Sequence, residues 1–134
     1  MTVQHSDAVR NGRLDSIETV VGVTPLLDFR TGAQPVNCAA ADGGTELEHM
    51  ALPSDWMAAA SGGTKAKAGA WTGTVDADGT AGHYRLKDST DTTCHEQGSV
   101  TGTGGGGDIE LDNAVLATGQ TITVNTWTYT EGNA

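Results

Sequence analysis

The chain has 134 residues, which is enough for one ordinary domain with its own core and too few for two sizeable ones. It contains 19 glycines and only 4% aromatic residues, a composition that suits short strands joined by many turns. With 17 acidic against 7 basic side chains the formal net charge is -10, so neither nucleic acid nor an anionic membrane is expected as a direct partner. Residues 1–16 contain no continuous apolar stretch that reads as a signal peptide, which predicts synthesis in the cytoplasm.

Residues 6–21 are the one long segment with helical spacing. Ser6 or Asp7 can cap its first turn, and Gly22 offers a stop signal. The apolar stripe is thin, so this helix needs a surface to pack on, either the rest of the chain or a neighbour. We therefore divide the chain into a helical arm, residues 1–22, and a main domain, residues 23–134. The apolar side chains spaced for one helix face are Leu14, Ile17 and Val21.

After this segment the pattern changes to the period of two that a half-buried strand needs. Leu27 and Phe29 alternate with Asp28 and Arg30. Turn residues rich in glycine and aspartate separate the segments that follow. Further strands are expected at residues 45–52, 65–74, 82–87, 93–101, 108–111 and 121–130.

A second, short helix is expected at residues 54–60, capped by Ser54 and anchored by Trp56. In the last strand the apolar side chains change parity after residue 124, which calls for a bulge near Asn125 or for cover on both faces. Many short strands with few helices between them predict a mainly β fold. We expect an antiparallel β-sandwich or jelly-roll-like barrel with a short N-terminal helix and one short internal helix.

The glycine run at residues 101–107 has the composition of a phosphate-binding loop. It lacks the following Lys-Ser or Lys-Thr and runs into Asp108 and Glu110, whose charges repel phosphate. We interpret it as a flexible hairpin connection.

Residue types that bind zinc are present but poorly arranged. Cys94 and His95 are adjacent, and neighbouring strand residues point to opposite faces. We therefore expect no metal site from these two residues with His49, His83 and Cys38. Free thiols are the expected state of the two cysteines, with a disulfide as the alternative.

No pattern supports catalysis, so we expect no catalytic residues, no cofactor and no enzyme activity. No serine lies in a G-x-S-x-G elbow, and no carboxylate pair is recognisable as an acid and base facing one cleft. The loop aspartates are interpreted as turn-forming residues, with a loosely held cation as the alternative: Asp76, Asp78, Asp88 and Asp91. We expect the three tryptophans to fill the core of this chain, in preference to anchoring an interface by filling a pocket of a partner. They are Trp56, Trp71 and Trp127.

Several segments spread over the chain carry a resemblance to a known class. They are residues 8–19 (AVRNGRLDSIET), 52–60 (LPSDWMAAA), 79–85 (GTAGHYR), 93–98 (TCHEQG), 111–113 (LDN) and 132–134 (GNA). In these segments the chain resembles small virion structural proteins encoded by tailed phages and prophages. The resemblance implies a location in the phage particle and brings no catalytic residues with it.

Within that class we expect a capsid decoration or cement protein on the outer head surface. Its partners would be the major capsid protein or other virion proteins. We also expect the chain to form a homo-oligomer, which we take to be a trimer. A neck, tail or fibre-associated virion protein is the structural alternative, and a carbohydrate- or cation-binding module is the alternative of another class. The residues expected to contribute an interface are Val9, Leu14, Ile17, Val21 and Trp56.

Overall fold

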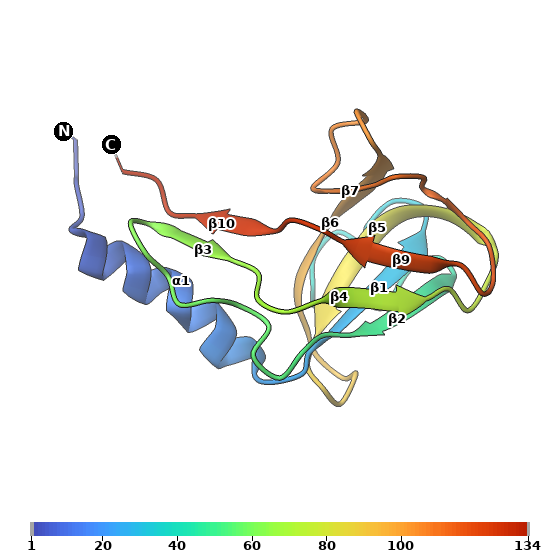
Figure 1. Ribbon diagram of the computed structural model, residues 1–134, viewed down its shortest axis with the longest axis horizontal. Helices are drawn as coiled ribbons and strands as arrows, with labels where there is room; N and C mark the ends of the chain where they lie inside the picture. The colour runs from blue at the N-terminus through green and yellow to red at the C-terminus, as the bar shows by residue number, and fades with distance from the viewer. Residues whose placement is uncertain (1, 134) are drawn as a thin grey trace.

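The protein consists of a curled β body from which a helix and a two-stranded ribbon extend to one side (Figure 1). The computed structural model describes residues 2–133. Both ends of the chain lie at the tip of the extension. The elements in chain order are α1 (Asp7–Val21), β1 (Leu26–Thr31), β2 (Glu46–Ala51), β3 (Thr64–Ala66), β4 (Trp71–Thr74), β5 (Gly79–Lys87), β6 (Cys94–Gly102), β7 (Ile109–Leu111), β8 (Val115–Leu116), β9 (Thr121–Val124) and β10 (Thr128–Thr130).

The body is barrel-like. Its main sheet has the strand order β2-β1-β5-β6-β7, and β8 pairs with the start of β5. The antiparallel pair β4–β9 closes the curl, because β4 contacts β2 and β9 contacts β7. The prediction of a mainly β, sandwich- or barrel-like fold is therefore confirmed. Among the described residues no helix has the length and apolar character needed to cross a bilayer.

Alternation along the strands builds the core. Leu27 lies opposite Met50 on one side and Leu86 on the other, and Phe29 lies opposite Tyr84. Each of these side chains is withdrawn from water, and such burial stabilises a fold by about 1.5–3 kcal/mol per large apolar residue. The β4–β9 pair and the strands around it cover the core from the other side with Trp71, Val75, Ile122 and Val124.

The predicted N-terminal helix is confirmed and is fastened to the same chain. The Ser6 hydroxyl accepts a hydrogen bond from the Val9 amide, and Gly22 ends the helix with a positive φ of 88°. The ammonium group of Lys65 on β3 lies 2.8 Å from Asp15 and 2.9 Å from Glu18, although the Lys65 side chain is 1% exposed. Buried charge of this kind persists only when it is paired, so α1 is held against the ribbon.

Trp56 fixes the inner end of the helix by donating its indole N–H to the Gly22 carbonyl, at 3.0 Å. The expected short helix at residues 54–60 is wrong. This segment is extended instead, because its amides and carbonyls bond across to residues 66–68, as in the 2.8 Å bond from the Ala58 amide to the Ala66 carbonyl. Pairing with a distant segment and complete burial of Trp56 outweigh local helix propensity.

Two predicted strands are each divided in the structure. Residues 65–74 form β3 in the ribbon and β4 in the body, and residues 121–130 form β9 in the body and β10 in the ribbon. The interruption at residues 125–127 is where the chain leaves the body, and it accounts for the change of parity after residue 124.

Cys38 and Cys94 form a disulfide, so the expectation of free thiols is wrong. Cys94 begins β6 opposite Lys87 of β5, and the neighbouring Arg85 binds the carbonyls of Asn37, Cys38 and Ala40. The loop that contains Cys38 is thereby drawn against the sheet, with the two Cα atoms 5.2 Å apart. That separation is normal for a disulfide.

The glycine run does not form a hairpin, because β7 runs parallel to β6. The carboxylate of Asp108 accepts hydrogen bonds from the amide and hydroxyl of Ser99, and Glu110 accepts from the Gly104 and Gly106 amides. These side chains turn the chain back beside β6 and hold the loop closed. The Gly104 and Gly106 amides already have a carboxylate partner, so no phosphate-like ligand is needed to explain this glycine run.

Candidate functional site

A group of charged side chains lies on the face of the main sheet that points away from the core. Asp28 of β1 lies directly opposite His49 of β2. A bulge between Phe29 and Arg30 then shifts the register by one residue, so Arg30 lies opposite Glu46. In a regular strand residues 46 and 49 point to opposite faces; the bulge brings both to the face of Asp28.

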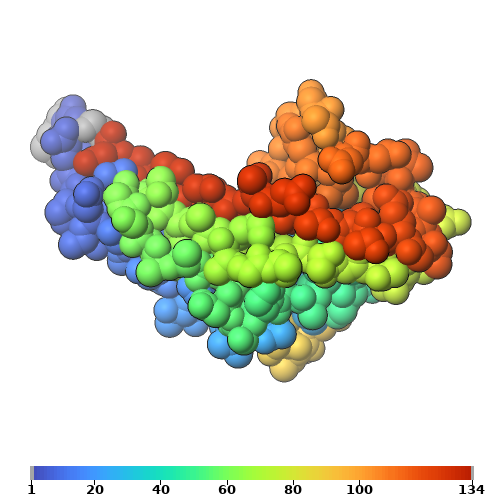
Figure 2. Space-filling model, viewed as in Figure 1, coloured from blue at the N-terminus to red at the C-terminus, as the bar shows by residue number. Residues whose placement is uncertain are grey.

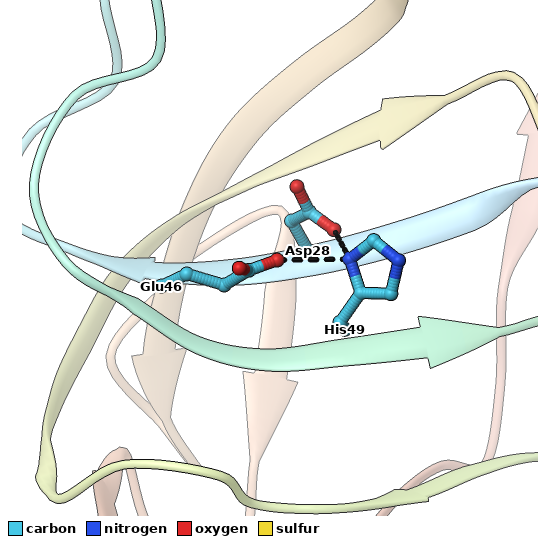
Figure 3. A group of neighbouring side chains, drawn as sticks. All are labelled: Asp28, Glu46 and His49. Carbon is cyan, nitrogen blue, oxygen red and sulfur yellow. Dashed lines mark hydrogen bonds and ion pairs between the residues drawn. The ribbon is translucent and has the colours of Figure 1, made fainter. Parts of the chain in front are cut away.

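These three side chains point toward one another from two neighbouring strands (Figure 3). His49 Nδ1 lies 2.8 Å from Glu46 Oε1 and 2.9 Å from Asp28 Oδ1. The other nitrogen of the ring points away from both carboxylates (Figure 3). Asp28 is completely buried, whereas the side chains of His49 and Glu46 are 34% and 39% exposed. The group therefore has a buried floor and an open side.

Positive side chains surround the buried carboxylate on its other side. Lys87 Nζ lies 3.4 Å and Arg30 3.6 Å from Asp28 Oδ2. Asp42 joins this network from the disulfide-linked loop, at 2.5 Å from Lys87 and 2.7 Å from Arg85. The disulfide thus holds in place a loop whose carboxylate balances two buried cations.

The electrostatics of the group favour a further positive charge. Burial raises the pKa of Asp28, and the neighbouring Glu46 raises it further. Burial by itself would lower the pKa of His49, but the hydrogen bond to Glu46 and the charge of Asp28 outweigh it, so the His49 pKa is raised. Burial disfavours ionised Asp42, yet hydrogen bonds from Lys87 and Arg85 prevail and its pKa is lowered. A proton on His49, or another cation in its place, is stabilised here.

A second buried carboxylate, that of Glu48, lies on the core side of β2, the strand that carries Glu46 and His49. Glu48 is 2% exposed, and its Oε2 has no hydrogen-bond partner among the described residues. Burial, with the charge of Asp76, raises its pKa to about 7. Its carboxyl group rests over Gly73 of β4, where a Cβ atom would come within 2.1 Å of Oε1. The glycine gives this side chain its space.

A groove of about 450 Å³ opens beside the ribbon, between β6 and the start of β10. Glu96 lies in it and accepts hydrogen bonds from the hydroxyls of Tyr84, at 2.7 Å, and of Tyr129. Burial, together with the negative charge of Glu96, raises the pKa of both tyrosines. Trp127 lines the groove and packs edge-on against both rings. Aromatic faces beside a carboxylate are a surface that a sugar ring can use.

The residues expected to form an interface differ in how exposed they are. Leu14, Val21 and Trp56 are buried in contacts within this chain, Ile17 is half-buried, and Val9 is exposed. Val9 and Val20 lie on the same outer face of α1, about three turns apart with Arg13 and Ser16 between them, and Val20 is 67% exposed; we call this face the α1 stripe. Ile17, Val20 and His95 line a shallow apolar hollow between α1 and β6, which we call the helix hollow.

The zinc-type residues named from sequence do not gather. Cys38 and Cys94 are bonded to each other, and His83 is buried with its Nδ1 2.9 Å from the Gly32 carbonyl. Only His49 belongs to a group with metal-ligand geometry in the described part of the chain. Its partners Asp28 and Glu46 were missed, because a bulge leaves no local signature in the sequence.

Among the loop aspartates, Asp88 forms a turn, as interpreted from the sequence, whereas Asp78 joins two loops that are far apart in the chain and Asp91 pairs with Lys87. Asp88 accepts hydrogen bonds from the amides of Thr92 and Thr93, and Asp78 from the amide and hydroxyl of Thr118. Trp56 and Trp71 are core residues, and Trp127 packs against the core from the groove.

Comparisons with protein-family models, with curated proteins and with solved structures gave no match to this chain.

Proposed function

We propose that this chain is a virion structural protein of a tailed phage, a decoration or cement protein bound to the outer surface of the head. Its partner in this proposal is the major capsid protein. The proposal rests first on the resemblance carried by the sequence segments described above. It assigns binding and no reaction to the chain.

The observation that carries the proposal is the division of the molecule into a body and a fastened extension. In the space-filling view the extension stands out from the body and makes the molecule elongated (Figure 2). The paired Lys65 and the Trp56 bond fix the orientation of α1, so its outer stripe is presented without a large ordering cost on binding. A rigid, projecting element lowers the ordering cost each time a copy attaches to a shell.

Two further features support this function. Val20 of the α1 stripe lines the helix hollow, which gives apolar contact area on a molecule whose formal net charge is -10. The Cys38–Cys94 disulfide suits a protein that ends on a particle released into oxidising surroundings.

The test is uptake by shells. Purified heads that lack this product are mixed with the wild-type chain or with a Val20→Glu variant, and bound protein is measured after sedimentation. We expect saturable binding of the wild type and at least a tenfold loss for Val20→Glu. Val115→Glu is the matched control, because Val115 is 60% exposed on the body, far from α1 in the sequence. Failure of the wild type to bind any such shell refutes the proposal.

The oligomeric state is a separate part of the proposal. We propose a trimer, which would place one copy of the α1 stripe in each of three equivalent positions around a local three-fold axis. Sedimentation equilibrium of the free protein distinguishes a trimer from a monomer. A neck, tail or fibre location is the alternative within the same class, and the number of copies per particle separates it from the head.

The groove at Glu96 favours a carbohydrate-binding module as the second candidate. Trp127 is the tryptophan at that groove, since Trp56 and Trp71 are 0% and 2% exposed. A glycan array tests this candidate, with Trp127→Ala as the variant expected to lose any binding. An array without a single specific ligand removes it.

A further inference from the structure

We propose that Asp28, Glu46 and His49 form a binding site for one divalent transition-metal ion of the Zn²⁺ class. This inference is independent of the proposed location in a phage particle. It concerns the outward face of the β1–β2 pair shown in Figure 3.

The first argument is geometric. His49 Nδ1 lies at 2.8 and 2.9 Å from one oxygen of each carboxylate, and the three donor atoms are all within 4.8 Å of one another. Two ligands bound at about 2.1 Å to one tetrahedral ion lie about 3.4 Å apart. The donor atoms need to separate by only about 0.5 Å to take up the spacing of ligands of a common ion.

The second argument comes from Asp28 alone. Its side chain is completely buried, and neither carboxylate oxygen has a hydrogen bond from the described residues. The 2.9 Å approach of His49 Nδ1 to Oδ1 is an ion-pair distance without the alignment of a hydrogen bond. Lys87 and Arg30 approach Oδ2, so Oδ1 is directed at the space shared with Glu46 and His49. A buried carboxylate oxygen without a hydrogen bond is costly, and a metal ion would satisfy it.

The third argument is the charge of the whole network. The carboxylates of Asp28, Glu46, Asp42 and Asp91 outnumber the cations Arg30, Arg85 and Lys87 by one. With neutral His49 the network carries a net negative charge. A divalent ion at the His49 end would change this net charge from -1 to +1, and it would lie at Oδ1 of Asp28, whereas Lys87 approaches Oδ2.

The donor set selects the kind of ion. One imidazole nitrogen with two carboxylate oxygens suits Zn²⁺, Co²⁺ or Ni²⁺, whereas Ca²⁺ needs six to eight oxygen ligands. The exposed sides of His49 and Glu46 leave room for water as the remaining ligand. Such an ion would join β1 to β2 across their bulge, and the open coordination position would face solvent.

The test is titration of the oxidised, full-length chain with Zn²⁺ by isothermal calorimetry and with Co²⁺ by visible absorption. We expect one ion per chain, and binding at least about tenfold weaker in each of the variants Glu46→Gln and His49→Gln. Both positions are partly exposed, so the variants should fold, which melting without metal checks. His95→Gln is the control histidine variant and should bind like the wild type.

A measurement on the wild type keeps the test independent of the variants. Imidazole nitrogen spectra should show Zn²⁺ shifting the signals of His49 and leaving those of His83 unchanged. The proposal is overturned if 1 mM Zn²⁺ produces no binding, or if the ion binds equally well to His49→Gln.

Discussion

Replacing the buried Glu48 by glutamine should change how stability depends on pH. The carboxyl group is 2% exposed, and burial with the charge of Asp76 raises its pKa from 4.5 to about 7. Because the folded-state pKa is above the unfolded one, the folded chain holds this proton more tightly. The resulting stabilisation is complete below about pH 4.5 and is lost as the pH rises to about 7.

The size of the effect follows from the shift in pKa. The rise of the Glu48 pKa from 4.5 to about 7 corresponds to about 3 kcal/mol in the free energy of unfolding. Glutamine resembles the protonated, neutral form of Glu48 at every pH. Glu48→Gln should therefore match the wild type near pH 4.5 and exceed its stability by up to about 3 kcal/mol at pH 8.

The assay is urea denaturation of both proteins at several pH values from 4.5 to 8, with the disulfide intact. The difference between the two proteins isolates Glu48 from the other groups that titrate in this range. Repeating the comparison in a His49→Gln background removes the adjacent imidazole, whose pKa is also raised. A difference in unfolding free energy that stays constant with pH would refute the reasoning.

Further predictions concern the disulfide, two glycines and the buried lysine. Changing Cys38 and Cys94 to serine should cost about 4 kcal/mol, from the 56-residue separation in the chain-entropy relation, and an unchanged urea midpoint would contradict this. Gly82→Ala should cost at least about 2 kcal/mol, because its Cβ would lie 2.3 Å from a backbone carbonyl oxygen. Gly12→Ala should raise the free energy of unfolding by about 1 kcal/mol, because Gly12 lies in a helix with open space for a Cβ atom. In thermal melting, Gly82→Ala should therefore unfold below the wild type and Gly12→Ala above it. Lys65→Met should cost about 2 kcal/mol and speed hydrogen exchange in α1, while slow exchange retained there would show that the helix is held otherwise.

Much of the fold could be predicted because alternation and capping are local. The Leu27 and Phe29 pattern located β1, and the two candidate caps Ser6 and Asp7 with Gly22 located the ends of α1, of which the structure uses Ser6 and Gly22. The segment at residues 54–60 could not be predicted, because its structure depends on pairing with residues 66–68. The hairpin predicted for the glycine run was wrong for the same reason, because β7 pairs parallel to β6, with Asp108 accepting from the Ser99 amide of β6 and Glu110 from the Gly106 amide.

The candidate site was less accessible to sequence reasoning than the strands. Alternation placed Asp28 on the polar face of β1, but the side chain is completely buried there, with Arg30, His49 and Lys87 around its carboxylate. The meeting of Glu46 with His49 requires a bulge that only the paired strands reveal. The site residues meet only through the pairing of β1 with β2 and its bulge. No fixed spacing in a single sequence indicates that pairing.

The number of copies of this protein in purified virions tests the proposed function most directly. Quantitative mass spectrometry measures it against the major capsid and portal proteins of the same particles. A decoration protein predicts a number comparable to that of the capsid protein. A number near that of the portal would contradict the head location and favour the neck or tail, and absence from the particles would contradict the virion function altogether.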